Sequence, residues 1–149
     1  DIAKLSNIKN DAIKSILSAK LLEAQNRGIS ISVEIEEPVS NFRIELLDFI
    51  TILSVLCDNA IEATIEAISP RMTVAFMNND DSLVLIVENS IKSEKVDVNH
   101  IFDRGYSSKG EGRGLGLHNV NSVLEKYPKS TITTRSANYL FSQTIKFCK

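Results

Sequence analysis

The chain has 149 residues, of which 43% are hydrophobic and 24% are charged, and its formal net charge is −2. This length and composition predict one globular domain with a substantial core. A net charge so close to zero gives no support to a nucleic-acid-binding surface.

The sequence shows no signal peptide and no apolar run long enough to span a membrane. It opens at Asp1 rather than at Met, so we expect a piece of a longer protein whose membrane anchor, if any, lies outside it. The two cysteines, Cys57 and Cys148, are predicted to be free thiols in a reducing cytosol. Neither has a histidine at zinc-ligand spacing, so a zinc site is not predicted.

Residues 1–27 are predicted to form one helix, because apolar side chains recur at helical spacing along them. Gly28 supplies a stop signal at the C-terminal end of this helix. The first part, with Leu5, Ile8 and Ala12, is similar to a short coiled-coil seam. Because the seam is short, we expect the isolated chain to be mostly monomeric.

Residues 29–36 alternate between apolar and polar side chains, which predicts a strand with one solvent-facing side. The central helix is predicted from about Glu45 to Ile68, ending before Pro70. Two strands follow as a hairpin, over residues 73–77 and 83–87, and the second is apolar on both faces and therefore central in its sheet.

Regular periodicity is lost from Glu88 to Gly112, and such long irregular segments are often functional lids. A helix is predicted over residues 115–127, and a closing hairpin over residues 130–136 and 140–147. This element order predicts an α+β two-layer sandwich, in which helices cover one face of a mostly antiparallel or mixed sheet.

The central helix carries Asn59 opposite its apolar stripe. The stripe is formed by Ile50, Leu53, Cys57, Ala60, Ile61 and Thr64. Asn59 instead has apolar or small neighbours, which are Ile52, Val55, Leu56 and Ala63. An amide in these surroundings needs a partner, which is either the backbone or a ligand.

Five of the six glycines fall within residues 105–116, directly before a predicted helix. Glycine permits close approach of the backbone, and a helix start offers free N–H groups and the positive end of a dipole. Lys109 and Arg113 add positive charge, so the segment is a candidate phosphate cradle. The alternative is a flexible loop with solvated charges. The order of residues fits neither a Walker loop nor a dinucleotide-binding fingerprint.

Two acidic residues extend this candidate site. Glu88, at the end of the central strand, is able to accept a hydrogen bond from an exocyclic amine such as that of adenine, although the residue alone favours a capping acid at a loop start. Glu62 lies three residues after Asn59, so the two side chains are neighbours on the helix. Mg²⁺ prefers oxygen ligands in proteins, and the phosphates of a nucleotide often fill part of its coordination shell.

Asp58 is interpreted as part of a solvated helix face. Neither histidine has a Ser or Cys partner that predicts nucleophilic catalysis.

Taken together, these features resemble the ATP-binding (GHKL, or Bergerat) fold that gyrase B, Hsp90, MutL and the sensor histidine kinases share. The segments that resemble its N box, first glycine box, F box and second glycine box are residues 58–63, 88–90, 101–105 and 110–117. The residues from Tyr106 to Leu117 are most similar to the AgrC/ComD-like peptide-pheromone receptor kinases of Gram-positive quorum sensing.

The resemblance implies that residues 21–149 are a catalytic ATP-binding domain and that residues 1–20 are the end of a dimerisation and phosphoacceptor helix. It implies catalytic roles for Asn59, which would ligate Mg²⁺, and for Lys109 and Arg113 at the ATP phosphates. It further implies that Glu88 binds the adenine amine and that residues 91–112 form an ATP lid. The remaining ATP-binding residues implied are Glu62, Asn89, Phe102, Arg104, Ser108, Gly110, Gly112, Gly114, Leu115, Gly116 and Leu117.

Two positions depart from the family pattern. Val55, one turn before Asn59, stands where gyrase-like relatives carry a Glu that activates water and many kinases carry Asn. Valine neither activates water nor binds metal, so phosphoryl transfer is favoured over hydrolysis. Ser90 stands where the first glycine box has Gly, and this predicts looser packing beside adenine.

The function implied is that of the cytoplasmic catalytic domain of a membrane sensor histidine kinase. It would pass the γ-phosphate of Mg-ATP to a histidine on a dimerisation domain, for transfer to a response regulator in two-component signalling. The full receptor would be dimeric and would meet the membrane only through segments outside this chain. The alternative is a degenerate nucleotide-sensing or protein-docking module, which Val55 and Ser90 support.

Overall fold

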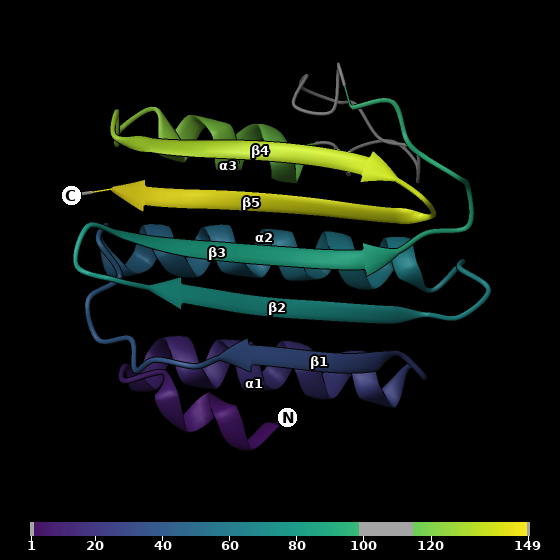
Figure 1. Cartoon of the computed structure of the whole chain (residues 1–149), viewed down its shortest axis with the longest axis horizontal. Coiled ribbons are helices and arrows are strands. Elements are labelled where there is room, and N and C mark those ends of the chain that lie inside the picture. Colours follow the sequence, from purple (N-terminus) through teal and green to yellow (C-terminus); the bar gives the residue numbers. More distant parts are fainter. Residues whose placement is uncertain (1, 99–114, 149) are drawn as a thin grey trace.

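The computed structural model describes residues 2–98 and 115–148. Five strands form one sheet in the order β1-β2-β3-β5-β4, and α1, α2 and α3 lie together on one of its faces (Figure 1). The strands are β1 (Ser30–Ile35), β2 (Arg71–Asn78), β3 (Ser82–Ser90), β4 (Ser130–Ala137) and β5 (Leu140–Cys148). The helices are the 3-10 helix η1 (Ile2–Asn7), α1 (Asp11–Asn26), α2 (Leu46–Thr64) and α3 (Leu115–Leu124). The pairing of β1 with β2 is parallel and the others are antiparallel, so the predicted α+β sandwich with a mixed sheet is confirmed.

Strand β3 lies at the centre of the sheet, between β2 and β5, as its two apolar faces predict. It is longer than predicted, because residues 88–90 continue the strand instead of opening a loop. Asn89 lies opposite Met72 of β2 and Phe141 of β5. Pairing on both sides thus holds polar residues in a strand despite their low strand propensity.

The prediction of a single helix over residues 1–27 is wrong, because η1 and α1 are separate elements. Ile8 leaves the helical path and forms a parallel bridge with Val39, where the Lys9 N–H donates to the Val39 carbonyl at 2.7 Å. A new helix begins after Asn10, whose side-chain Oδ1 accepts from the Ile13 N–H at 3.0 Å. Leu5 and Ile8 are only 3% and 2% exposed within this domain, so the predicted coiled-coil seam is not a free surface here.

Helix α1 belongs to the same core as the sheet. Its buried residues include Leu17 and Leu21, and it runs through residue 20 without interruption. The helix ends at a left-handed Gly28 (φ 82°), where the Ile29 N–H donates to the Ala24 carbonyl at 3.0 Å, as expected for a glycine stop. The division of the chain near residue 20 into two domains stays a prediction.

Helix α2 lies across the middle of the sheet, between α1 and α3 (Figure 1). Most of its predicted apolar stripe is buried, but Ile50 is only half-buried, whereas Ile52 and Leu56 on the side assigned to Asn59 are fully buried. The neighbouring helices explain this difference, because they cover flanks of α2 that a single stripe leaves to solvent. The helix ends at Thr64, four residues before the predicted end. None of the helices described is long and apolar enough to cross a membrane.

The start of α2 is tied to the segment that follows α3. Helix α3 ends at Leu124 rather than at Tyr127, because the Lys126 and Tyr127 N–H groups turn back to carbonyls three residues earlier. The Tyr127 hydroxyl donates a short hydrogen bond to Asp48, and Lys126 Nζ lies 3.0 Å from the same carboxylate. These two hydrogen bonds lower the pKa of Asp48 below its ordinary value of 3.8.

Shortening a buried side chain of α1 tests whether this helix is part of the core. We expect Leu17→Ala to lower the free energy of unfolding by about 2–5 kcal/mol, because Leu17 is fully buried. Leu22→Ala on the same helix, where the side chain is 56% exposed, is the matched control and is expected to change it by less than about 0.5 kcal/mol. Urea denaturation measures both, and equal effects would show that α1 does not pack as described.

The Asp48 cluster predicts a specific pH dependence. Because the folded-state pKa of Asp48 is lowered, its ionised form stabilises the fold above about pH 4, and this stabilisation is lost as the pH falls through the folded-state value. Asp48→Asn should therefore destabilise the domain at pH 7, and the difference from the parent should shrink towards pH 3. Thermal melts across this range measure it. Asp81→Asn, on an exposed turn, should show no such trend.

Candidate functional site

The candidate site lies where the second half of α2, the end of β3 and the start of α3 meet. Thr64, at the end of α2, places its hydroxyl 2.7 Å from that of Ser90 at the end of β3. The start of α3 reaches α2 at Gly116, which contacts Val55. Asn59 and Glu62 lie on α2 between these two contacts, and both are half-buried. The fold therefore brings together the helix that resembles the N box and the described ends of the two segments that resemble the glycine boxes.

Asn59 is next to an ion pair that joins α1 to α2. Asp58 is exposed, as predicted for a solvated face, and its Oδ1 accepts from Lys20 Nζ at 2.7 Å. Partial burial opposes the charge on Lys20, but the hydrogen bond and the negative charge of Asp58 outweigh it, and the pKa of Lys20 is raised. Nothing in the sequence pattern indicated this pair, because its members are 38 positions apart.

Glu88 and Asn89 lie on opposite faces of the sheet. Asn89 is 2% exposed and its cross-strand neighbour Met72 is 1% exposed, which puts Asn89 on the face that the helices cover. Glu88 is half-buried beside Thr73 and Ser142 on the other face. Glu88 therefore does not share a face with Asn59, and its predicted contact with adenine is not favoured by this position. Because successive side chains of a strand point to opposite faces, extending the strand through residue 89 puts Asn89 on the same face as the buried Leu85 and Val87.

Gln143 is a second polar side chain on the covered face, and the sequence analysis did not identify it. It is 3% exposed, lies opposite Val87 of β3, and donates from Nε2 to Thr134 Oγ1 at 3.3 Å. Its alternation with the buried Ile145 and Phe147 in β5 was the available signal. Buried amides at this depth need hydrogen-bond partners, so Asn89 and Gln143 give the covered face a polar end.

Ser90, which stands where the family pattern has glycine, forms a compact hydrogen-bond cluster, and the looser packing beside adenine stays a prediction. Its Oγ donates to the Ser69 carbonyl at 2.9 Å and accepts from the Arg71 N–H at 3.0 Å. The same N–H donates to Thr64 Oγ1, also at 3.0 Å. The two hydroxyls thus join the end of α2, the start of β2 and the end of β3.

Val55 packs against α3. A Cβ atom on Gly116 would lie 3.1 Å from Val55 Cγ1, which is tighter than an ordinary van der Waals contact. Glycine therefore allows α3 to approach α2 at this level. Leu117, predicted among the ATP-binding residues, is a core residue with 7% exposure, and its contact with ATP stays a prediction.

Several predicted site residues lie outside the described part of the chain. These are Phe102, Arg104, Ser108, Lys109, Gly110, Gly112, Arg113 and Gly114. Their assignments, and that of residues 99–112 to a lid, stay predictions. Of Leu115, only its place as the first residue of α3 is described.

The two cysteines are free thiols. Cys57 is a fully buried residue of α2, whereas Cys148 is exposed. Burial raises the pKa of the Cys57 thiol to about 12, so it stays protonated and is a poor metal ligand at neutral pH. Within residues 2–98 and 115–148, no three His, Cys, Asp or Glu side chains gather as a metal centre. A metal bound near Asn59 would consequently rely on oxygens of a ligand as well as on this chain.

Comparison with known proteins places this geometry in a family. Residues 44–148 match the GHKL domain family. The chain is 30% identical to the sensor protein CitS of Bacillus subtilis over 125 residues, covering 80% of this chain and 23% of CitS. It is 31% identical to the sensor histidine kinase DcuS of Escherichia coli K12 over 144 residues, covering 93% of this chain and 26% of DcuS. The chain thus spans about a quarter of the length of these relatives.

A solved catalytic domain of the histidine kinase ThkA has the same fold. It superposes with a TM-score of 0.76 at 19% identity, covering 95% of this chain and 92% of that one. At this identity the likeness concerns the fold alone. The predicted subgroup of peptide-pheromone receptors is not identified by any of these similarities.

Replacing Ser90 with the glycine that the family pattern has tests the hydroxyl cluster. We expect Ser90→Gly to lower the free energy of unfolding by about 1–3 kcal/mol, because the Arg71 N–H loses one of two acceptors and the Ser69 carbonyl loses a donor at a partly buried site. Ser93→Gly, in the exposed segment after β3, is the control. Denaturant unfolding measures both, and a stability gain in Ser90→Gly would contradict the role given to the hydroxyl.

Proposed function

Because this chain belongs to the GHKL family, we propose that it binds Mg-ATP and transfers the γ-phosphate to a histidine on the dimerisation domain of a sensor histidine kinase. The observation that supports this proposal is that α2, which carries Asn59, contacts the end of β3 through Thr64 and Ser90 and the start of α3 through Val55 and Gly116. The inward-facing Asn89 directly precedes Ser90. These elements supply amide groups and a helix N-terminus, which suit a nucleotide with its metal ion.

The residues of this chain fit Mg-ATP by their chemistry. The Asn59 amide oxygen would ligate Mg²⁺, with Glu62 one turn later as a further oxygen donor. We assign the adenine contact to Asn89 in preference to Glu88, because Asn89 is on the face that α2 covers. The bound metal would neutralise the phosphate charge, while Lys109 and Arg113 would contact the phosphates.

Val55 favours transfer over hydrolysis. Its side chain packs on Gly116 and has no group that could accept a proton from water. An imidazole nucleophile needs no base at this position, so positioning and charge neutralisation would provide most of the rate. Sustained ATP hydrolysis by this domain alone is not expected.

The wider setting extends the proposal to the full receptor. We propose a membrane receptor of the AgrC/ComD-like kind, in which this domain is cytoplasmic and serves quorum sensing through a response regulator. The similarity to CitS and DcuS supports a sensor kinase without supporting this subgroup. The rival is a degenerate domain that senses nucleotide or docks a partner without kinase activity, which Val55 and Ser90 favour by their departure from the family pattern.

The decisive experiment is calorimetric titration of the domain with Mg²⁺ and a non-hydrolysable ATP analogue. We expect saturable binding, and we expect Asn59→Ala to weaken it by at least about tenfold, equivalent to ~1.4 kcal/mol, because a metal ligand is lost. Asn121→Ala, an exposed amide on α3, is the control and should bind as the parent does. Absence of saturable binding at millimolar analogue would favour the docking module.

The catalytic step needs the full-length receptor. There, Asn59→Ala should abolish autophosphorylation while circular dichroism shows an unchanged fold. Undiminished autophosphorylation would overturn the assignment of Asn59.

A further inference from the structure

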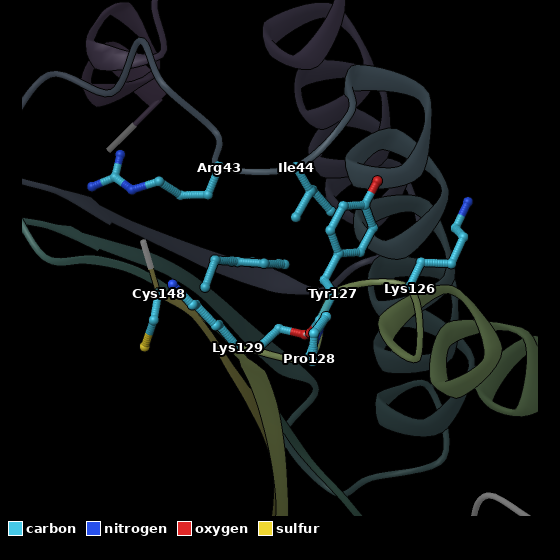
Figure 2. Close-up of a pocket in the computed structure, with 9 residues that line it drawn as sticks. Arg43, Ile44, Lys126, Tyr127, Pro128, Lys129 and Cys148 are labelled. Carbon is cyan, nitrogen blue, oxygen red and sulfur yellow. The ribbon is translucent and has the colours of Figure 1, made fainter.

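A pocket of about 240 Å³ lies at the end of the molecule opposite the candidate nucleotide site. It is lined by the segment before α2, the turn after α3 and the end of β5, with Ile44, Lys129 and Cys148 among the residues around it (Figure 2). Asp48, at the start of α2, is hydrogen-bonded to the lining residues Lys126 and Tyr127. The α-helix rises 1.5 Å per residue, so Asn59, 11 positions later on the same helix, is roughly 16 Å away from Asp48. The pocket is therefore a separate feature, and nothing in the proposed function uses it.

The inner surface of the pocket is largely apolar. Ile44, Pro128 and the Tyr127 ring contribute to it, together with Phe147, which is 1% exposed. Its volume lies below the 300–1,000 Å³ that sites for whole small molecules usually occupy. A space of this size suits one bulky apolar side chain better than an entire cofactor.

Positive charge surrounds this apolar space. Arg43, Lys126 and Lys129 line the pocket and no acidic residue does, although the whole chain has a net charge of −2. Lys126 is neutralised by Asp48 at 3.0 Å. Lys129 is exposed and has no hydrogen-bond or ion-pair partner within the described residues.

Arg43 is held in place without a carboxylate partner. Its guanidinium donates to the Asn79 carbonyl at 2.6 Å, the Asn41 carbonyl at 2.9 Å and Asn78 Oδ1 at 3.1 Å. Its backbone is fixed as well, in the left-handed region at φ 73°, where its N–H donates to Asn41 Oδ1. In the described part of the chain, the charges of Arg43 and Lys129 are thus both uncompensated.

We propose that this pocket docks a short acidic segment of a partner protein that carries one bulky apolar side chain. The apolar side chain fills the space between Ile44 and Phe147, and carboxylates beside it pair with Lys129 and lie in the positive field of Arg43. Apolar burial provides affinity, and the charges select the partner and raise the association rate. The commitment to an acidic partner follows from charge complementarity at the rim.

Three fluorescein-labelled heptapeptides test this on the domain by fluorescence anisotropy. The first carries a central tryptophan flanked by glutamates, the second has serine in place of tryptophan, and the third has lysines in place of the glutamates. We expect the first to bind saturably and the other two at least about tenfold more weakly, equivalent to ~1.4 kcal/mol. Equal binding of the serine peptide would overturn the apolar pocket, and equal binding of the lysine peptide would overturn the charge selection.

Two charge-reversal variants, one at the pocket and one far from it, test whether the peptide binds at this pocket. Lys129→Glu is expected to weaken binding of the first peptide at least about tenfold, and Lys129→Met by a smaller factor. Lys92→Glu makes the same charge change at an exposed position beyond the opposite end of β3 and should leave affinity within about twofold. Both positions are exposed, so folding is not at stake. Equal weakening by Lys129→Glu and Lys92→Glu, or no saturable binding at millimolar peptide, would overturn the proposal.

Discussion

The packing of α2 on the central strand is the constraint on which the rest of this structure depends. Strand β3 has neighbours on both sides, and α2 is covered by α1 and α3 on its flanks, so neither element is able to shift without opening the core. Leu53, Leu56 and Cys57 of α2 and Leu85 of β3 are all at most 1% exposed. This burial leaves α2 little freedom to rotate, and it thereby fixes the direction in which Asn59 points.

Polar contacts then fix α2 at both of its ends. At the start, Asp48 accepts from Tyr127 and Lys126, which ties α2 to the end of α3. At the end, Thr64 and Ser90 join α2 to the strands. Core packing alone would allow α2 to slide slightly along its own axis. Hydrogen bonds at both ends of α2 prevent such a movement, because their distances and angles are specific. The side chain of Asn59, near the end of α2, is held in its place by this restraint.

The element order and the central place of β3 could be predicted from the sequence, since alternation and helical periodicity report local burial directly. The break at Ile8 could not, because it depends on a bridge to Val39, 31 positions away in the sequence. The inward direction of Asn89 was within reach of alternation, but it was obscured because residues 88–90 were assigned to a loop. The hydroxyl cluster of Ser90 was out of reach, because the sequence showed only a missing glycine and not the Arg71 N–H that the hydroxyl satisfies. Residue types thus indicated the chemistry of the site, whereas its geometry depended on tertiary pairings.

Val55 and Gly116 show how packing and chemistry are linked at one position. The helices are in close contact here, because a Cβ atom on Gly116 would lie only 3.1 Å from Val55 Cγ1. The apolar Val55 therefore closes the space between the helices at the level where a base for water would stand. Val55 thus has a role in seating α3 on α2 that a sequence motif alone does not indicate.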